Sequence, residues 1–416
     1  MLLITIFVIS LIAVLNYRFG IRFLYPPVVF CSVWAADLAV VWLCNGLFYP
    51  ISYRTLMIFL VGCVAFSFGA LLATLTFKRI KNRSYDIKAS NRMLNALLLI
   101  VLVAVPLIYH WISSIAADFP GTNFFVSAYT AMNVVFDAGE QSVFIINLIS
   151  LSSVVALVCV CERDKHGKRA ILAIALAIFI LTMTGTRSGL VIMIFAAICI
   201  EWMRSGKLQL KFLMPIAVVL LVVVSGLAIF IHKGDATESA SLTDNLVPVV
   251  QGLAVYAAGG PPAFSQVVEK PTTIEHNWRV STFFLAWANR FGAHYKIPPI
   301  HAEYVTVGPD QLYNVYSMYF AYLDWGYAGM ASLVGLVGFT VTMTYFRALT
   351  GNRFALLLYG YFFAGMVLSP YAEYFFLGLS SILKLFEIYW IIFRLPVHWS
   401  RLWASDQKVI RTVCPV

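Results

Sequence analysis

Residues 55–77 read TLMIFLVGCVAFSFGALLATLTF and contain no charged side chain. A helix crosses a hydrocarbon core of about 30 Å with roughly 20 apolar residues, so this run is long enough to span a membrane. Similar runs recur along the 416 residues, of which 61% are hydrophobic and only 12% are charged. A soluble domain this apolar could not cover its surface with polar groups. We therefore predict an all-α polytopic membrane protein, with residues 1–416 in a single integral membrane domain.

The apolar runs predict about eleven transmembrane helices, within a range of roughly 10–14. The first run is expected to remain as a helix, because no basic residue precedes it and no small-residue cleavage pattern follows it. The expected spans cover residues 1–16, 27–48, 55–77, 94–113, 141–160, 170–184, 189–203, 212–231, 327–346, 354–372 and 377–394.

The basic residues predict the orientation of these spans. Most of the 29 lysines and arginines fall in alternate connections, and the positive-inside rule places these in the cytoplasm. The other connections are then extracytoplasmic, among them a large loop over residues 232–313. The net charge of +10 follows from this bias and from attraction to anionic lipid, and it requires no nucleic-acid partner. The basic connections are residues 17–23, 78–92, 161–169, 203–211 and 347–353, with the tail from Arg394.

The large loop concentrates groups that can carry chemistry. Within it, residues 277–291 have the pattern of an amphipathic helix. Arg279 and Arg290 lie three helical turns apart on one face, about 16 Å from each other, so they cannot both bind one diphosphate. They suit two neighbouring anionic ligands, or one phosphate and one sugar. Glu275 precedes Arg279 by one turn, which also fits an ordinary salt bridge, whereas Arg290 has no acid one turn away.

A second candidate site is the turn Thr184-Gly185-Thr186-Arg187-Ser188-Gly189, which joins two short expected spans. Small residues surround Arg187, so backbone N–H groups and a guanidinium can converge on an anion there. The alternative is a lone arginine that anchors the chain at the membrane interface.

Residues 313–327, which read YNVYSMYFAYLDWGY, follow the large loop. Their aromatic rings suit stacking on sugars, and an aromatic belt at the membrane interface explains them equally well. Asp324 and Glu373 lie near the outer ends of spans. A carboxylate is costly beside lipid, so both are expected to face a cavity or a partner.

Several motifs are absent from the sequence. There is no Asp-x-Asp, no P-loop and no H-E-x-x-H, and the seven cysteines include no C-x-x-C pair. The sequence therefore indicates no nucleotide, metal or other cofactor.

Three short segments carry a resemblance to a known family: Thr184–Gly189, Tyr256–Phe264 (YAAGGPPAF), and Asn314-Val315-Tyr316 followed by Asp324–Gly329 (DWGYAG). On these residues, and in layout over nearly the whole chain, the sequence resembles the O-antigen polymerases (Wzy), or oligosaccharide repeat unit polymerases. Relatives often read T-N-V-Y-T and D-F-G-x-x-G in the third segment. The paired R-x10-G loops of some relatives are not present, because eleven residues after Arg279 is Arg290 and eleven after Arg290 is His301. No residue roles are carried over from those loops.

The resemblance implies the architecture of the C-type glycosyltransferases and the O-antigen polymerases and ligases, in a bacterial inner membrane. The implied enzyme transfers a growing glycan from undecaprenyl diphosphate to an incoming lipid-linked repeat unit at the periplasmic face. Its leaving group requires cations, for which the candidates are Arg187 and Arg290, with Arg279 behind them. Candidates for a base on the acceptor hydroxyl are His276, Glu275, His301 and Glu373. The residues expected to contact substrate are Tyr256, Tyr313, Asn314, Tyr316 and Asp324.

The implied partners are the undecaprenyl-diphosphate-linked donor and acceptor, membrane lipid and a chain-length regulator protein. Two other functions stay open at this point. An O-antigen ligase has a similar layout and donor but transfers glycan to lipid A core. A flippase for lipid-linked oligosaccharides would need charged residues along a path through many spans, whereas the charges here cluster outside the expected spans.

Overall fold

The computed structural model describes residues 1–20, 24–77, 91–119, 124–137, 143–184, 187–206, 252, 254–270, 279–297, 304–309, 311–315 and 317–394. Contacts within the chain divide it into two compact units, each of which is described by itself. Unit 1 comprises Met1–Asn82, Val191–Thr350 and Tyr359–Ser380, and unit 2 comprises Arg83–Leu190, Gly351–Leu358 and Ser381–Val416. The prediction of one integral membrane domain stays a prediction.

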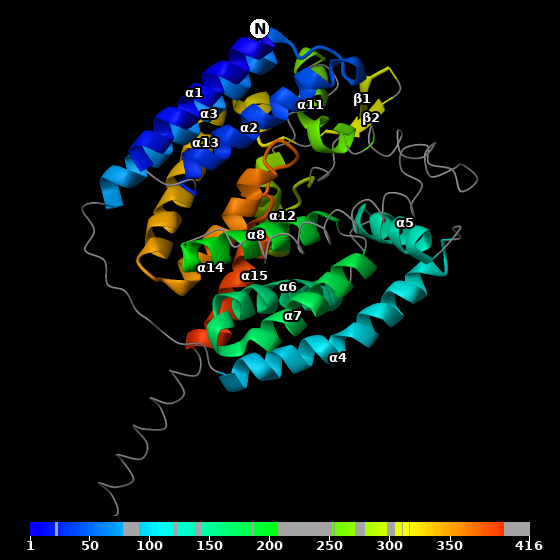
Figure 1. Ribbon diagram of the computed structural model, residues 1–416. Helices are drawn as coiled ribbons and strands as arrows, with labels where there is room; N and C mark the ends of the chain where they lie inside the picture. Colours follow the sequence, from blue (N-terminus) through cyan, green and yellow to red (C-terminus); the bar gives the residue numbers. More distant parts are fainter. Residues whose placement is uncertain are drawn as a thin grey trace, which may run out of the picture. The chain divides into compact units, whose positions relative to one another are not determined.

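Helices make up most of the described chain (Figure 1). Unit 1 contains α1 (Leu2–Gly20), α2 (Pro26–Leu43), η1 (Asn45–Leu47), α3 (Tyr53–Phe77), α11 (Gly260–Glu269), η3 (Arg279–Ser281), α12 (Thr282–Arg290), β1 (Tyr304–Gly308), β2 (Gln311–Asn314) and α13 (Ala321–Leu349). Unit 2 contains α4 (Asn91–Ala116), α5 (Phe124–Asp137), α6 (Val143–Cys161), α7 (Arg163–Met183) and the π-helical turn η4 (Trp390–Arg394). Residues of α8 (Arg187–Ser205), α14 (Arg353–Val367) and α15 (Leu379–Tyr389) belong to both units.

Six helices of the described residues are long and apolar enough to cross a membrane. By length and composition, they make the chain a mostly helical, multi-pass membrane protein. Each expected span falls on a helix, except residues 212–231, which lie outside the described residues. The six candidate spans are Pro26–Leu43, Tyr53–Phe77, Asn91–Ala116, Phe144–Cys161, Ser188–Ser205 and Ala321–Leu349, and two shorter apolar helices are Leu2–Arg18 and Arg353–Val367.

The mostly helical structure is consistent with the expected all-α class, and it also contains a short two-stranded antiparallel sheet, β1 and β2, in the region expected to form the large loop. Tyr304 pairs with Asn314 and Val305 with Tyr313, and the register shifts between Thr306 and Gly308. The aromatic and β-branched side chains of this segment fit a half-buried pleated surface. The run is only five residues long, so its pattern was hidden between longer helical signals.

Two other connections are also more ordered than expected. The connection between the spans expected over residues 94–113 and 141–160 contains α5 (Phe124–Asp137). The basic connection expected over residues 161–169 is almost entirely helical, because α7 begins at Arg163, directly after Glu162.

Helices α3 and α13 of unit 1 approach each other through glycines (Figure 1). A Cβ atom at Gly69 would overlap the carbonyl oxygen of Gly335, and one at Gly338 would overlap the carbonyl oxygen of Phe66. Small residues at such a crossing let two backbones come close, which is how helices gain packing energy in an apolar solvent. The close packing of α3 on α13 therefore depends on glycine at these positions.

An aromatic cluster from three segments packs beside this pair. The ring of Trp34 lies 4.8 Å from that of Phe59 and 4.9 Å from that of Tyr319. One turn after Trp34 on α2 is Asp37, which is buried. Its Oδ2 atom has no hydrogen-bond partner among the described residues.

Helix α13 is kinked at Gly326, where φ is 64° and ψ is −162°. This backbone region is open essentially to glycine alone, because a Cβ atom would collide with its own main chain. The kink separates the first residues of α13, including Asp324, from the long part that packs on α3. The kink therefore explains why residue 326, in the DWG segment, is a glycine.

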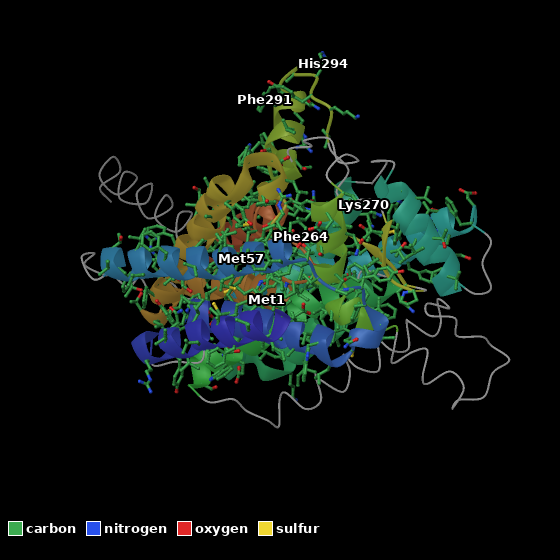
Figure 2. All side chains as sticks on the ribbon, turned by 90° about the horizontal axis from the view of Figure 1, so that it is seen from above. Met1, Met57, Phe264, Lys270, Phe291 and His294 are labelled. Atoms are coloured by element: carbon green, nitrogen blue, oxygen red, sulfur yellow. The ribbon has the colours of Figure 1, made fainter. Side chains whose placement is uncertain are left out.

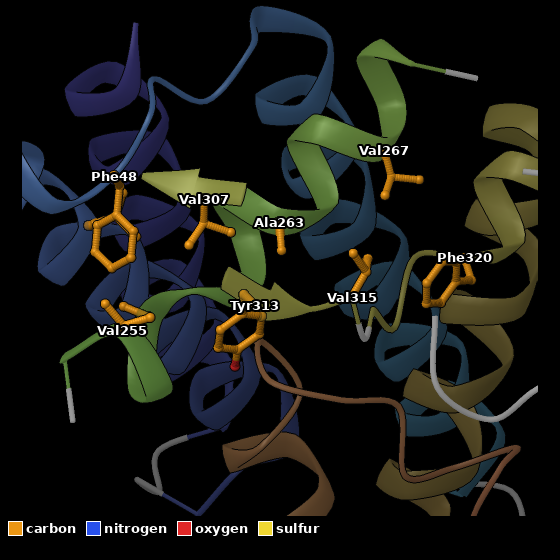
Figure 3. Close-up of a cluster of buried hydrophobic side chains, with 10 residues drawn as sticks. Phe48, Val255, Ala263, Val267, Val307, Tyr313, Val315 and Phe320 are labelled. Atoms are coloured by element: carbon orange, nitrogen blue, oxygen red, sulfur yellow. The ribbon is translucent and has the colours of Figure 1, made fainter. Parts of the chain in front are cut away.

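A hydrophobic cluster joins α11 to the sheet, to Val41 near the end of α2 and to Phe320 directly before α13 (Figure 3). In the close-up, Val307 of β1, Tyr313 of β2 and Ala263 of α11 lie side by side. Gly308 lets β1 pack directly on the chain at Leu47, because a Cβ atom there would overlap the carbonyl oxygen of Leu47. The buried members are Val41, Phe48, Val255, Ala258, Ala263, Val267, Val307, Tyr313, Val315 and Phe320.

Unit 2 is held at the start of α14 by an ion pair between Arg353 and Glu162, which is buried between α6 and α7. The Phe354 ring packs at 4.9 Å from that of Tyr389 on α15. Lys384 of α15 donates a hydrogen bond of 3.3 Å to the Ser150 hydroxyl on α6. Polar contacts thus tie α6, α14 and α15 together among otherwise apolar surfaces.

Candidate functional site

Three tyrosines from distant parts of the chain form a hydrogen-bonded cluster in unit 1. Tyr371 Oη donates to Tyr256 Oη at 2.7 Å, and Tyr313 Oη donates to the backbone oxygen of Tyr256 at 3.0 Å. The Tyr371 ring lies 4.9 Å from that of Tyr256 and 6.3 Å, edge-on, from that of Tyr313.

Two glycines let the backbone reach this cluster. A Cβ atom at Gly259 would overlap the Tyr313 ring, and one at Gly260 would overlap the carbonyl oxygen of Pro370. Pro261 then starts α11, in the first turn where proline is favourable. The Gly-Gly-Pro-Pro sequence is thus a close-packing element that joins α11 to the tyrosines.

Glu373 lies two residues beyond Tyr371 and is buried. Its Oε1 atom accepts hydrogen bonds from the backbone N–H groups of Phe375 at 2.6 Å and Phe376 at 2.8 Å, and its Oε2 atom accepts one from Leu377 at 2.7 Å. Burial raises the pKa of Glu373, and these three donors oppose the shift. The carboxyl group therefore holds the turn before α15, and it also takes up a proton more readily than an exposed glutamate.

Asn314 and Asp324 stand on either side of a run of polar and aromatic residues that begins at the end of β2. Asn314 ends β2, and its Oδ1 atom is buried without a hydrogen-bond partner among the described residues. Asp324 lies in the first turn of α13 and is half-buried. Tyr316, between them, lies outside the described residues.

Arg54 is a site residue that the sequence reasoning left without a role. It lies at the start of α3, is exposed, and donates from Nε to Tyr322 Oη at 2.7 Å. Its guanidinium carbon also lies 5.5 Å from the centre of the Tyr322 ring, which is 4.8 Å, edge-on, from that of Tyr327. Glu269 at the end of α11 is near enough to interact with it electrostatically. The sequence feature that could have indicated Arg54 is its position as a lone cation directly before the expected span 55–77.

The other predicted cations are described only in part. Arg290 ends α12 and is exposed, with its guanidinium carbon 5.7 Å from the centre of the Trp287 ring. Arg187 is the first residue of α8 and Arg279 the first of η3, but their side chains lie outside the described residues. Of the candidate bases, Glu275, His276 and His301 lie outside the described residues as well.

The structure thus brings Tyr256 and Tyr313 into direct contact and places Asn314 next to Tyr313 in the same strand. Glu373 follows Tyr371 by two residues, and its carboxyl oxygens accept hydrogen bonds from backbone N–H groups of its own turn. In the part of the chain that the structure describes, no group of three or more His, Cys, Asp or Glu side chains is arranged to hold a metal ion. The cluster offers aromatic rings, phenol hydroxyls and a neighbouring amide, which are groups suited to binding hydroxyl-rich ligands.

Comparisons of this chain with protein-family models, curated proteins and solved structures find no match.

Proposed function

We propose that this chain is a polymerase of lipid-linked oligosaccharide repeat units in a bacterial inner membrane. The observation that carries the proposal is the contact between one segment of the family resemblance, Tyr256–Phe264, and Tyr313, which directly precedes the Asn314-Val315-Tyr316 segment. Tyr313, beside Asn314, donates to the backbone of Tyr256, and Gly259 packs against its ring. Residues more than fifty positions apart in the sequence therefore contribute to one aromatic and polar surface.

In the proposed reaction, a hydroxyl oxygen of the incoming repeat unit bonds to the anomeric carbon of the growing glycan. The bond from that carbon to the diphosphate breaks, and undecaprenyl diphosphate leaves with the electron pair. Cations stabilise the charge that develops on this leaving group. We assign this task to Arg187 and Arg290, with Arg279 behind them, and we add Arg54 because Tyr322 fixes the direction of its guanidinium.

The proton of the acceptor hydroxyl needs a base. The candidates remain Glu275, His276, His301 and Glu373. Glu373 is the one whose side chain the structure describes, and its raised pKa brings it closer to the neutral range in which a base works best. Its three backbone donors also give it a purely structural task, so its activity must be measured separately from its effect on folding.

The remaining parts of the proposal concern topology and partners. We propose about eleven spans, with residues 232–313 as a periplasmic loop, on the basis of the basic connections. Tyr256, Tyr313, Asn314, Tyr316 and Asp324 are the proposed sugar contacts. The proposed partners are two lipid-linked oligosaccharides, membrane lipid and a regulator of chain length.

Deletion of the gene tests the function class directly, with the surface glycan separated on a gel. A polymerase mutant should leave lipid A core capped with single repeat units, because ligation continues without polymerisation. Loss of all glycan from lipid A core, with lipid-linked polymer retained, would show a ligase instead.

The arginine assignment is tested by Arg187→Ala and Arg187→Lys. The alanine variant should abolish long chains, since loss of one charge-assisted contact to a developing anion costs on the order of 3 kcal/mol, about a hundredfold in rate. The lysine variant should restore little, because it keeps the charge but loses the planar, two-pronged donor. Glycan length on a gel is the measurement, with protein level determined in parallel.

Arg347→Ala is the matched control, because Arg347 is an exposed arginine in the last turn of α13, in a connection expected in the cytoplasm. It should leave glycan length unchanged. Long chains from an Arg187→Ala protein made at normal level would mean that Arg187 serves only as an interface anchor.

A further inference from the structure

Helix α12 and the turn that follows it expose a row of large aromatic side chains. None of the nine residues of α12 is buried. The exposed fractions are 58% for Phe284, 42% for Trp287, 81% for Phe291 and 58% for Tyr295. In Figure 2, Phe291 lies apart from Met57 and Phe264, which mark α3 and α11 of the same unit. Contiguous exposed apolar surface of this kind marks an interaction site.

These aromatic side chains share one face of the helix. Phe284, Trp287 and Phe291 follow one another at spacings of three and four residues, which places them one above the other. The Trp287 ring lies 5.9 Å from that of Phe291 and 6.3 Å from that of Phe283. The face is therefore a continuous aromatic strip and not a set of isolated side chains.

The turn after α12 holds the strip in place. Gly292, with φ of 93°, ends the helix in a conformation that favours glycine. The Asn289 side chain then donates to the backbone oxygen of Tyr295 at 2.8 Å and accepts from its N–H at 2.8 Å. Phe291 and Tyr295 are thus presented to the outside by an ordered, hydrogen-bonded turn.

The charge of the segment is of one sign. Residues 279–297 include Arg279, Arg290 and Lys296 and no aspartate or glutamate. Arg290 extends over the Trp287 ring at the border of the aromatic strip. Cations that flank an aromatic face complement a layer of phosphate groups above an apolar layer, which is the surface of a phospholipid membrane.

The length of α12 decides how it can meet the membrane. Nine residues rise by about 14 Å, less than half of a hydrocarbon core of about 30 Å, so α12 cannot cross it. Tryptophan and tyrosine favour the boundary between headgroups and acyl chains. The candidate spans already place this chain in a membrane, so a phospholipid surface is always close to the segment.

We infer that residues 282–297 dock on the membrane surface, with Phe284, Trp287, Phe291 and Tyr295 inserted below phosphate groups that Arg290 and Lys296 contact. This inference goes beyond the proposed polymerase activity and does not depend on it. The diphosphate of a lipid-linked substrate lies in the same headgroup layer as the phospholipid phosphates. Arg290 can therefore contact either kind of phosphate group.

The test uses the full chain in lipid nanodiscs, with accessible native thiols replaced by serine and one new cysteine carrying a fluorophore. Phe291→Cys and Phe284→Cys place the label on the aromatic strip, and Thr306→Cys places it on the exposed side of β1 as a matched control. Both strip positions are well exposed, so the substitutions should not hinder folding. Lipids that carry a nitroxide just below the headgroup quench only labels that reach that depth.

We expect quenching several-fold stronger at positions 291 and 284 than at 306. Replacing anionic lipid by zwitterionic lipid, or combining Arg290→Gln with Lys296→Gln, should weaken the quenching at 291. Quenching at 291 and 284 no stronger than at 306 overturns the inference. So does a label at 291 that is shielded from both the nitroxide lipid and a water-soluble quencher, since a protein would then cover the strip.

Discussion

Helices α3 and α12 are both rich in apolar side chains, but they stand in opposite relations to the rest of unit 1. Helix α3 buries Phe59 and Phe66 completely and brings its backbone against that of α13 at Gly69. Helix α12 buries none of its residues and presents Phe291 outward on an ordered turn. Apolar content therefore predicts that a segment leaves water, while small residues at the right spacing decide whether it meets protein.

The largest effect is expected at the closest approach of α3 and α13. Gly338→Ala adds a methyl group that would overlap the carbonyl oxygen of Phe66, so the helices must separate. We expect a loss of about 3 kcal/mol in the free energy of unfolding, at the upper end for overpacked sites. Unfolding by SDS in mixed micelles measures it.

Gly335→Ala is the control on the same helix, because its new Cβ atom would lie at an ordinary 3.4 Å from the Ala65 carbonyl oxygen. Equal losses for the two variants would show that the close approach at Gly338 does not distinguish α3 from a merely apolar helix.

The next effect is expected at the kink of α13. Gly326→Ala meets no atom within 4 Å, so its cost comes only from the φ of 64° and ψ of −162° that alanine avoids. We expect a loss of about 1–3 kcal/mol in the same unfolding measurement. Gly46→Ala, which also meets no atom within 4 Å and is not among the positive-φ glycines, should change little. A neutral Gly326→Ala variant would mean that the N-terminal end of α13 relaxes without strain.

Glu373 is intermediate between α3 and α12, because it is buried like the core residues of α3 but belongs to a turn. A folded-state pKa above the unfolded value means that the folded protein binds this proton more tightly. The carboxyl group then contributes stability at pH below its unfolded pKa, and this contribution is lost as pH rises through the folded pKa. The thermal midpoint of the parent should therefore fall with pH relative to that of Glu373→Gln, measured in detergent over an acidic to neutral series. A thermal midpoint of the parent that instead rises with pH relative to that of Glu373→Gln would show that the three backbone donors outweigh burial.

The smallest effect is expected on α12. Phe291→Ala removes a side chain that is 81% exposed, so the free energy of unfolding in detergent should change by less than about 0.5 kcal/mol. A loss comparable to that of a buried phenylalanine, about 3–5 kcal/mol, would mean that α12 packs on protein and that its contrast with α3 is wrong.

The helices could be predicted from the sequence because the apolar character of a run is a local property of consecutive residues. The start of α7 at Arg163 was missed, since its first turn is basic and hydropathy sees only the apolar part that follows. The β1–β2 sheet was missed because a five-residue strand gives a weak period, and Gly308 and Tyr313 pack on partners that are distant in sequence. Such contacts depend on tertiary structure and leave no local signal.

The candidate site could be predicted only in part for the same reason. Tyr256 was named from a family-like segment and Tyr313 from the aromatic stretch after the expected loop, and no spacing predicts the hydrogen bond between them. Arg54 was counted only as a charge, because its partner Tyr322 is far along the chain. Glu373 was expected to face a cavity or a partner, and the structure shows backbone N–H groups of its own turn as that partner.

The buried carboxyl of Asp37 has a consequence for how the chain enters the membrane during synthesis. An aspartate near the centre of a span raises the apparent free energy of insertion by about 2.5–3.5 kcal/mol. Helix α2 contacts both α1 before it and α3 after it, and Asp37 is buried in the folded unit. Insertion of α2 should therefore be cooperative, because α1 and α3 pack against α2 as the chain enters the membrane. A truncated chain that ends before Tyr53 should insert α2 less completely than the longer one.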